Sequence, residues 1–261
     1  MAGDRRADAM DRLRYAPILE ACRNAPRTRR ELAEATDVSR TTVYRMTVAL
    51  ADQEYVERTA DGYRTTTRGE AFGRLAETFL EGIEAIDRLD PLFEVISHPD
   101  LLDHAHTLTD PTVTTVDATD PYRVADRAIE RFEAAHDPRG VVSSASPTGL
   151  LEDAREIVDT KDRIEWLFAE RALAAHDAVG GEAFLDALEA PHLSIGVVPD
   201  EAVPFTFSVD RDDVSVSGHD PTSGLPTVIV ESDSPAAWAW LDGRFRSLQK
   251  RATPLNAWLG R

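Results

Sequence analysis

The amino-acid sequence predicts an α/β protein with a small N-terminal domain, a long joining helix and a larger C-terminal domain. Two observations support this prediction. Residues 28–50 have the spacing of two short helices joined by a tight turn, and beyond about residue 110 strand-prone and helix-prone runs alternate. A chain of 261 residues is long enough for two domains of ordinary size, and we expect the limits 1–68, 69–97 and 98–261.

Three short helices are predicted at the start of the chain. Residues 15–23 form the first, Thr28 opens the second, and Ser39 begins the third, because its hydroxyl can accept a hydrogen bond from an unpaired backbone N–H. In the third helix, apolar side chains recur at the spacing of a buried face at Val43, Met46 and Leu50. A turn of only three residues, 36–38, separates the second helix from the third.

A β-hairpin follows these helices. Two strand-prone runs, 55–59 and 63–67, flank an Asp61-Gly62 turn, which is a strong hairpin signal. Helices and hairpin in this order predict a winged helix-turn-helix. This fold is typical of DNA-binding proteins, although some winged helices serve only as protein–protein modules.

We therefore predict sequence-specific binding to double-stranded DNA. The N-terminal end of the third helix faces outward, where recognition helices touch base edges, and arginines on the hairpin can reach phosphates. The predicted DNA-binding residues are Arg30, Ser39, Arg40, Thr41, Thr42, Tyr44, Arg45, Arg58 and Arg64.

The distribution of charge agrees with this assignment. Residues 1–74 hold 14 arginines and 12 acidic residues, a net charge of +2, whereas the rest of the chain carries −20 of a total of −18. Only the N-terminal domain is therefore suited to phosphate contact. With 47 acidic residues and 2 lysines, the composition resembles that of haloarchaeal proteins, whose acidic surfaces stay hydrated when molar salt screens charges over about 3 Å.

A long amphipathic helix is predicted over 69–89, ending before Asp90-Pro91. Its apolar face contains Phe72, Leu75, Phe79, Ile83, Ile86 and Leu89. Such a face packs on its own domain, on a partner subunit, or on both. A homodimer with two-fold symmetry would read paired half-sites on DNA, and we expect one here.

The C-terminal domain is predicted to hold a mixed sheet with helices on its faces. Strands are expected at 112–117, 141–144, 163–168 and 192–198, and helices at 121–136, 147–158 and 169–189. An antiparallel hairpin around Asp212-Asp213, a strand in TVIVESD and a helix from Ser234-Pro235 to about Ala252 complete the domain.

Two segments resemble those of a known family. They are ELAEATDVSRTTVYRMTVAL and VPFTFSVDRDDVSVSGHDPTSGLPTVIVESDSPAAWAWLDGRFRSL, the second with Trp238 and Trp240 early in its helix. The chain resembles archaeal winged-helix regulators with a methanogenesis-regulator middle domain, many of them haloarchaeal. This implies a transcriptional regulator whose second domain senses an effector or mediates assembly. A looser similarity is to sugar-responsive archaeal regulators whose effector domains resemble phospholipase D.

Motifs for catalysis are missing from the sequence. Neither Lys161 nor Lys250 follows a histidine at the spacing that phospholipase D chemistry needs, and no nucleophile elbow, phosphate-binding loop or zinc-protease motif occurs. We expect no enzyme activity, no cofactor and no metal, since a helix over 99–107 would separate His98, His104 and His106. Without a signal peptide or an apolar span, and with Cys22 alone, we expect a cytoplasmic protein that does not enter membranes.

A ligand site is predicted where two strands of the C-terminal domain end, because parallel strands bring their carboxyl ends to one edge of a sheet. Its candidate residues are Asp117, Asp120, Ser143, Ser144, Ser146 and Thr148. The two carboxylates would repel a phosphate, which favours a neutral polyol or sugar. Alternatively, Ser146-Pro147 is an ordinary helix cap, and the protein is a DNA-associated architectural or assembly protein that senses no ligand.

Overall fold

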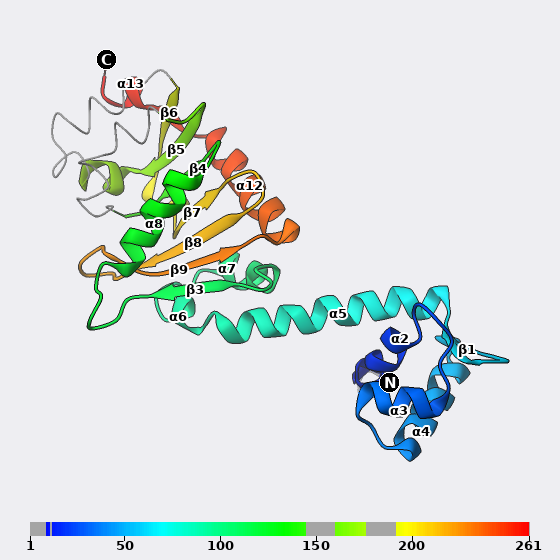
Figure 1. Ribbon diagram of the computed structural model, residues 1–261. Helices are drawn as coiled ribbons and strands as arrows, with labels where there is room; N and C mark the ends of the chain where they lie inside the picture. The colour runs from blue at the N-terminus through cyan, green and yellow to red at the C-terminus, as the bar shows by residue number, and fades with distance from the viewer. Residues whose placement is uncertain (1–8, 11, 145–159, 176–191, 261) are drawn as a thin grey trace. The chain divides into compact units, whose positions relative to one another are not determined.

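The computed structural model describes residues 9–10, 12–144, 160–175 and 192–260 (Figure 1). The chain forms two compact units, Met1–Glu81 and Gly82–Arg261. The division between the units falls inside one helix, α5 (Thr67–Arg88), whereas the sequence led us to expect boundaries after residues 68 and 97.

The N-terminal unit is a winged helix-turn-helix, as predicted. Its elements are α2 (Ala16–Ala21), α3 (Arg29–Thr36), α4 (Arg40–Asp52), β1 (Val56–Thr59) and β2 (Gly62–Thr65). Thr28 and Glu31 form a reciprocal capping box at the start of α3. Ser39 Oγ accepts the Thr42 N–H at 3.2 Å and caps α4. Between the helices, Asp37 takes the left-handed conformation, with φ of 52°, that a tight turn needs.

The core of this unit lies between the helices and the hairpin. Its buried side chains are Ile18, Leu19, Cys22, Leu32, Val43, Leu50, Tyr55, Val56 and Tyr63. Burial raises the pKa of the Cys22 thiol to about 11, so the side chain is a protonated core residue. Backbone hydrogen bonds between Arg27 and Tyr63, of 2.9 and 2.8 Å, attach the segment before α3 to the hairpin. Gly62 permits this approach, because a Cβ there would lie 2.3 Å from the carbonyl oxygen of Arg27.

The C-terminal unit is built on one eight-stranded mixed sheet of order β10-β6-β5-β4-β7-β8-β9-β3. Its strands are β3 (Thr112–Thr115), β4 (Arg139–Val142), β5 (Ile164–Ala169), β6 (Leu193–Val198), β7 (Thr206–Val209), β8 (Val214–His219), β9 (Pro226–Ser232) and β10 (Thr253–Pro254). Only β4, β5 and β6 pair in parallel, and every other neighbouring pair is antiparallel.

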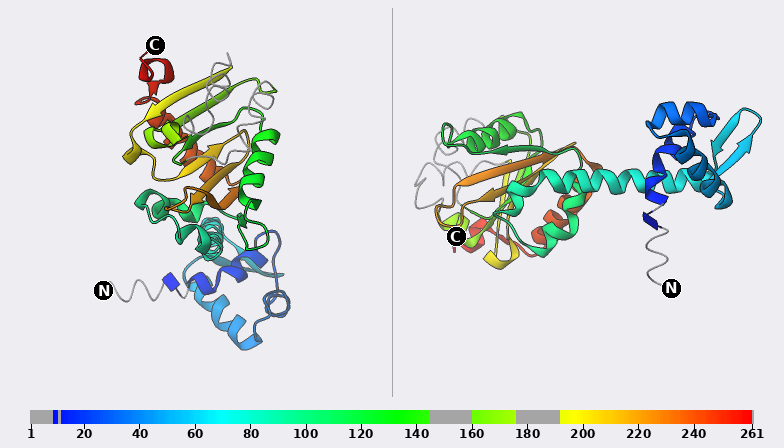
Figure 2. Two further views of the ribbon diagram at one scale, coloured as in Figure 1. Left: turned by 90° about the vertical axis from the view of Figure 1, so that its left-hand side faces the viewer. Right: turned by 90° about the horizontal axis from the view of Figure 1, so that it is seen from below.

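Helices cover both faces of this sheet. Those whose bounds lie wholly within the described residues are α6 (Asp90–Phe93), α7 (Pro99–His104), α8 (Arg123–Ala134), α12 (Pro235–Gln249) and α13 (Leu255–Trp258). Helix α8 lies on one face and α12 on the other, as the views in Figures 1 and 2 show. The main apolar core lies on the α12 face, where Leu241 and Phe245 are buried with alternate residues of the central strands. None of the described helices has the length and apolar character that a membrane crossing requires.

The predicted fold class is confirmed, but one strand lies elsewhere than expected. The hairpin around Asp212-Asp213 and the strand before α12 form as predicted. Strand β3, whose end was expected to share a cleft with the end of β4, pairs with β9 at the opposite edge of the sheet from β10. The reason is that β9 offers a free antiparallel edge, whereas β7 and β5 already occupy both sides of β4. The helix predicted over 147–158 and most of that over 169–189 lie outside the described residues.

A largely buried histidine at the end of β8 is expected to make the stability of the C-terminal unit depend on pH. Burial lowers the pKa of His219, at the end of β8, to about 4. The folded unit keeps this imidazole neutral, while the unfolded chain takes up a proton below about pH 6.5. The stability from the neutral form is therefore complete above pH 6.5 and is lost as the pH falls towards 4.

We predict that His219→Gln reduces the loss of unfolding free energy between about pH 7 and about pH 4.5 by about 2–3 kcal/mol. Tryptophan fluorescence during urea unfolding measures this, because all four tryptophans lie in the C-terminal unit. The same acid loss in wild type and variant would show that His219 is not protonated on unfolding.

Candidate nucleic-acid interface and ligand cavity

Four exposed arginines lie at the start of α4 and on the hairpin of the N-terminal unit. Arg40 and Arg45 project from the first two turns of α4, and Arg58 and Arg64 project from β1 and β2. Within the described part of the chain, no carboxylate lies within ion-pair distance of any of the four. Their charges are therefore available to an outside partner.

The arginines elsewhere in this unit are mostly engaged. Ion pairs join Arg23 to Glu20 and Glu77, Arg30 to Glu34, Arg68 to Glu54, and Arg74 to Glu70. Arg30, predicted from the sequence to bind DNA, thus has a partner 3.9 Å away on its own helix, although both side chains remain exposed. Exposed Arg27, in the segment before α3, also has no carboxylate within ion-pair distance among the described residues, so the α4 and hairpin arginines are distinguished by their place on the helix-turn-helix as well as by their lack of an ion pair.

Arg29 was not among the predicted site residues, yet it holds the predicted surface in place. Its guanidinium carbon lies 4.3 Å from the ring centre of Tyr44 and 5.1 Å from that of Tyr63. Its Nε also donates to the hydroxyl of buried Thr47 at 3.1 Å. Arg29 therefore connects α3, α4 and the hairpin. The only sequence signal was Thr47, a polar residue on the otherwise apolar side of α4.

The polar residues predicted at the start of α4 occupy two roles. Thr41 and Tyr44 are exposed, the latter by 53 %. Ser39 and Thr42 hydrogen-bond to each other at 2.9 Å, and Ser39 also caps the helix. These two side chains therefore shape the end of the helix that carries the arginines.

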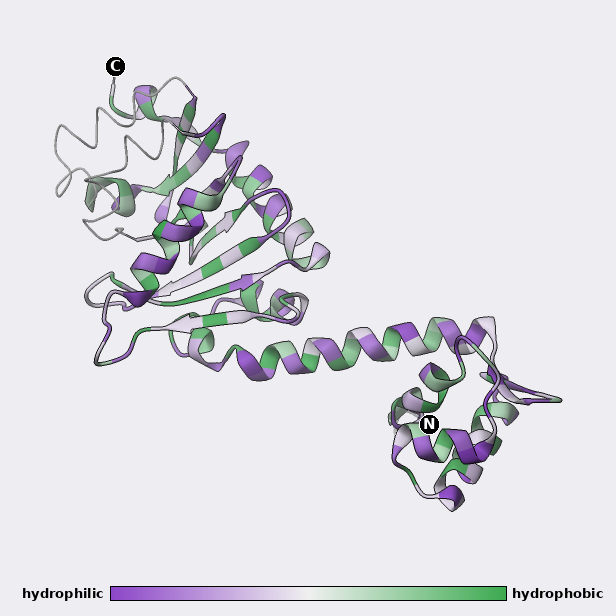
Figure 3. Cartoon of the chain, in the orientation of Figure 1, coloured by the Kyte–Doolittle hydropathy of each residue, from purple (hydrophilic) through white to green (hydrophobic). Residues whose placement is uncertain are grey.

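The apolar face predicted on α5 divides into buried and exposed parts. Phe72 packs on Tyr55, with ring centres 5.2 Å apart, and Leu89 is fully buried. The residues between them remain accessible at Leu75 (65 %), Phe79 (48 %), Leu80 (46 %), Ile83 (40 %) and Ile86 (41 %). Apolar and polar residues alternate along the helix in Figure 3. Small alanines, Ala76 and Ala85, take the buried positions instead.

The two groups of predicted ligand residues do not meet. Asp117 Oδ1 accepts hydrogen bonds from Thr119 and from the Asp120 N–H in its own turn, and these bonds lower the pKa of the Asp117 carboxyl. Ser143 Oγ lies 3.0 Å from Thr206 Oγ1, and Ser144 donates to the carbonyl oxygen of Gly224. Ser146 and Thr148 lie outside the described residues.

The topology explains the separation. Strands β3 and β4 run in the same direction, so their carboxyl ends lie on the same side of the sheet. Three strands, β9, β8 and β7, lie between them. At about 4.8 Å per strand, the two ends are about 19 Å apart. The expected shared cleft does not form in this arrangement.

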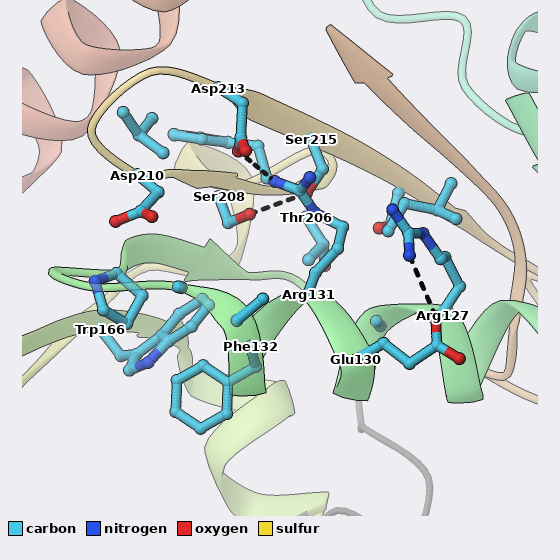
Figure 4. A pocket seen from close by; sticks show the side chains of 18 of the residues that line it. Arg127, Glu130, Arg131, Phe132, Trp166, Thr206, Ser208, Asp210, Asp213 and Ser215 are labelled. Carbon is cyan, nitrogen blue, oxygen red and sulfur yellow. Dashed lines mark hydrogen bonds and ion pairs between the residues drawn. The ribbon is translucent and has the colours of Figure 1, made fainter. Parts of the chain in front are cut away.

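A cavity of about 560 Å³ lies instead between α8 and the face of the sheet opposite α12. Figure 4 shows hydroxyls of Thr206, Ser208 and Ser215 on its sheet side, with Arg131 reaching from α8 towards Asp213 and with Trp166 and Phe132 at one end. This volume is within the range of small-molecule sites. In the sequence, the alternation of Ser and Thr with apolar residues in FTFSV and VSVSG indicates a strand face lined with hydroxyls. The sequence analysis predicted only a hairpin from these segments.

An ion cluster fixes α8 over this cavity. Arg127 donates to both oxygens of Glu231 at 2.9 and 2.8 Å, and Arg131 bridges Glu231 and Asp213 at 2.8 and 2.6 Å. Burial alone would raise the pKa of Glu231, but the hydrogen bonds from the two arginines lower it below its usual value. Glu231 therefore stays ionised.

The histidines weighed as metal ligands have other contacts. His104 stacks on Trp240, with ring centres 4.9 Å apart, and His98 accepts the backbone N–H of Asp100 at 3.3 Å. Across the described ranges, no group of three or more histidine, cysteine or acidic side chains is arranged to hold a metal ion.

Three solved structures that are similar to this chain each have a TM-score below 0.5, so these likenesses carry no argument about its activity. TrmBL2, an archaeal chromatin protein, is 14 % identical over 88 % of each chain, with a TM-score of 0.43. The phospholipase D family member Nuc from Salmonella typhimurium is 10 % identical over 56 % of this chain and 98 % of its own, with a TM-score of 0.42. NucT from Helicobacter pylori is 6 % identical over 56 % of this chain and 99 % of its own, with a TM-score of 0.43. None of the curated proteins matches the sequence.

Two family models match the chain itself. Residues 4–88 match the HVO_A0261 N-terminal domain, which covers the winged helix-turn-helix and α5. Residues 121–251 match the middle domain of the methanogenesis regulatory protein FilR1, which covers the sheet from β4 to β9 with α8 and α12. Since this second match spans half of the chain, the protein belongs to the family of regulators with a FilR1 middle domain.

Proposed function

We propose that the protein is a transcriptional regulator that binds specific sequences of double-stranded DNA through its N-terminal unit. The observation that carries this proposal is the group of exposed arginines on α4 and the hairpin without a carboxylate partner among the described residues. In a chain with a net charge of −18, carboxylates are abundant. Arginines that form no ion pair with these carboxylates can bind phosphates and base edges.

The two pairs of arginines have different tasks in this proposal. Arg40 and Arg45 lie at the N-terminal end of α4, the part of a recognition helix that reaches base edges in the major groove. Arg58 and Arg64 lie on the hairpin, where a guanidinium reaches the phosphate backbone. Arg29 stacks against Tyr44 and thereby fixes the surface beside Arg40 and Arg45.

We predict that Arg45→Ala weakens binding to the cognate DNA site by about 1–3 kcal/mol and relaxes the base preference at one position. Fluorescence anisotropy with the cognate duplex and its single-base variants measures both effects. The matched control is Arg74→Ala, which removes another exposed arginine, one that is paired with Glu70 on α5. Equal affinities for Arg45→Ala and wild type would contradict the role of α4 as the recognition helix.

For Arg64→Ala we expect weaker binding to specific and random DNA alike. The slope of log affinity against log salt should become shallower by about one phosphate contact, because one arginine fewer displaces counterions. Titrations at several salt concentrations give this slope. A loss confined to the cognate sequence would assign Arg64 to base reading instead.

We also propose that the protein is a homodimer that pairs through α5. Four large apolar side chains, Leu75, Phe79, Ile83 and Ile86, follow one another at three- and four-residue intervals and remain exposed in the single chain. An exposed apolar stripe of this kind marks a contact surface. A second copy of the chain fits it, because two recognition helices related by a two-fold axis read paired half-sites.

We predict that Phe79→Glu shifts the protein to monomers, raising the dimer Kd at least about 100-fold, because a charge enters an apolar contact. Light scattering measures the mass, and Thr78→Glu is the control, since it adds the same charge about 100° away around the helix. Salt should strengthen the dimer, because it screens repulsion between chains of net charge −18. A wild-type monomer at micromolar concentration would exclude pairing through this stripe.

The C-terminal unit, in our proposal, makes DNA binding respond to a small molecule in a halophilic cell. The cavity beneath α8 and the membership in a family of regulators support the first part. The excess of acidic residues and the presence of only 2 lysines support the second. We infer binding rather than catalysis, because the arginines of the cavity are engaged with carboxylates. A ligand changes DNA affinity only if it binds two arrangements of the protein unequally.

A further inference from the structure

The two faces of the central hairpin of the C-terminal unit differ in chemistry. Along β7 and β8, Phe207, Val209, Val214 and Val216 join the apolar core on the α12 face. The alternate positions hold Thr206, Ser208, Ser215 and Ser217, whose side chains face α8 because neighbouring residues of a strand point to opposite faces. A sheet face covered by a helix ordinarily carries apolar residues. Here it carries hydroxyls.

These hydroxyls form a compact block. Thr206 lies directly opposite Ser217, and Ser208 lies directly opposite Ser215, in the antiparallel register of β7 and β8. The Oγ atoms of Ser208 and Ser215 are 2.7 Å apart and share one hydrogen bond. Each hydroxyl has one proton to donate and two lone pairs. Thr206 already accepts the Ser143 N–H and shares a hydrogen bond with Ser143 Oγ, so the remaining capacity of the block lies mainly on Ser208, Ser215 and Ser217.

Aromatic rings close one end of the same cavity. Phe132 from α8 meets Trp166 from β5 edge to face, with ring centres 6.0 Å apart. Gly140 on β4 makes room for the indole, since a Cβ there would lie 2.2 Å from the ring of Trp166. A ligand in the cavity would therefore touch hydroxyls on the sheet and apolar ring surface at this end (Figure 4).

The charges around the cavity disfavour an anionic ligand. Among its described lining residues, four carboxylates outnumber three arginines. Arg127 and Arg131 already bind Glu231 and Asp213, and Arg211 pairs with Asp137. An anion would have to break these pairs and enter an acidic surrounding. A neutral molecule meets neither cost.

We propose that this cavity is the effector site and that its ligand is a small neutral polyhydroxylated molecule, of the sugar or polyol class. The ligand hydroxyls bond to the hydroxyl block of Thr206, Ser208, Ser215 and Ser217, and its carbon skeleton packs beside Trp166. This inference rests on the proposed function of the C-terminal unit as an effector-responsive domain. The proposed site lies on the face of β7 and β8 and not at the ends of β3 and β4, where the sequence predicted it.

Isothermal titration of the full chain in high salt tests the ligand class. The probes are glucose, maltose and myo-inositol, with glucose 6-phosphate and spermidine as charged comparators. We expect at least one neutral probe to bind with a Kd below about 1 mM, and tighter than either charged compound. Binding of only the charged compounds, or of none of the five at about 10 mM, would overturn the proposal.

Variants of the hydroxyl block test the location. The double variant Ser208→Ala, Ser215→Ala should raise the Kd of the neutral probe at least about tenfold, since both hydroxyls lose their bonds to the ligand. Ser194→Ala, an exposed serine on β6 outside the cavity, is the matched control and should leave the Kd unchanged. Ala128→Phe on α8 fills the cavity without touching the hydroxyls and should abolish binding. Binding that survives the double variant and Ala128→Phe lies elsewhere.

Ligand binding in the cavity and DNA binding through α4 are tested by independent experiments. Ligand titration is done without DNA, so it reports on the cavity whether or not α4 binds an operator. Anisotropy with DNA in the absence of ligand reports on Arg45 alone. Ligand binding without any effect on DNA affinity would retain the site but remove its regulatory role, whereas DNA binding without a neutral ligand would remove the site.

Discussion

The carboxylate of Glu231 is the group on which the C-terminal unit depends. It lies on β9, is almost fully buried, and binds two arginines of α8. Helix α8 has apolar contacts through Val124, Ala125 and Phe132, but the strands β7 and β8 below it carry hydroxyls, so the ion cluster adds to its attachment over the central strands. Removing one partner of such a buried pair leaves an uncompensated charge, which typically costs about 3–5 kcal/mol. The ion cluster therefore attaches α8 to the sheet on one side of the cavity.

The two units handle charge in opposite ways. In the C-terminal unit the arginines near the cavity are paired with carboxylates, so they offer no free positive charge to a ligand. In the N-terminal unit the arginines of α4 and the hairpin remain unmatched by any carboxylate among the described residues. In the halophilic cell that we propose, salt would screen the long-range attraction to phosphates, so short contacts from positioned arginines would become more important. The stack of Arg29 on Tyr44 serves that positioning.

Much of the N-terminal unit could be predicted because its signals are local. The helix start at Thr28, the Ser39 cap and the Asp61-Gly62 turn each depend on interactions within a few residues, and each occurs where the sequence indicates. Arg29 could not be assigned in this way. Its contacts join residues from α3, α4 and β2, which come together only when the three elements pack. Likewise, the pattern on α5 predicted an apolar face without indicating that its central residues stay exposed.

The sequence by itself determined the order of helices and strands, the winged helix-turn-helix and the alternation of apolar and hydroxyl residues in β7 and β8, because these follow from periodicity and turn chemistry. Only the tertiary structure decided where β3 pairs and which strands lie between Asp117 and Ser143. Strand pairing is set by long-range backbone hydrogen bonds that leave no periodic trace in the chain. For the same reason the cavity beneath α8 appears only when Glu231 meets Arg127 and Arg131 across about 100 residues of sequence.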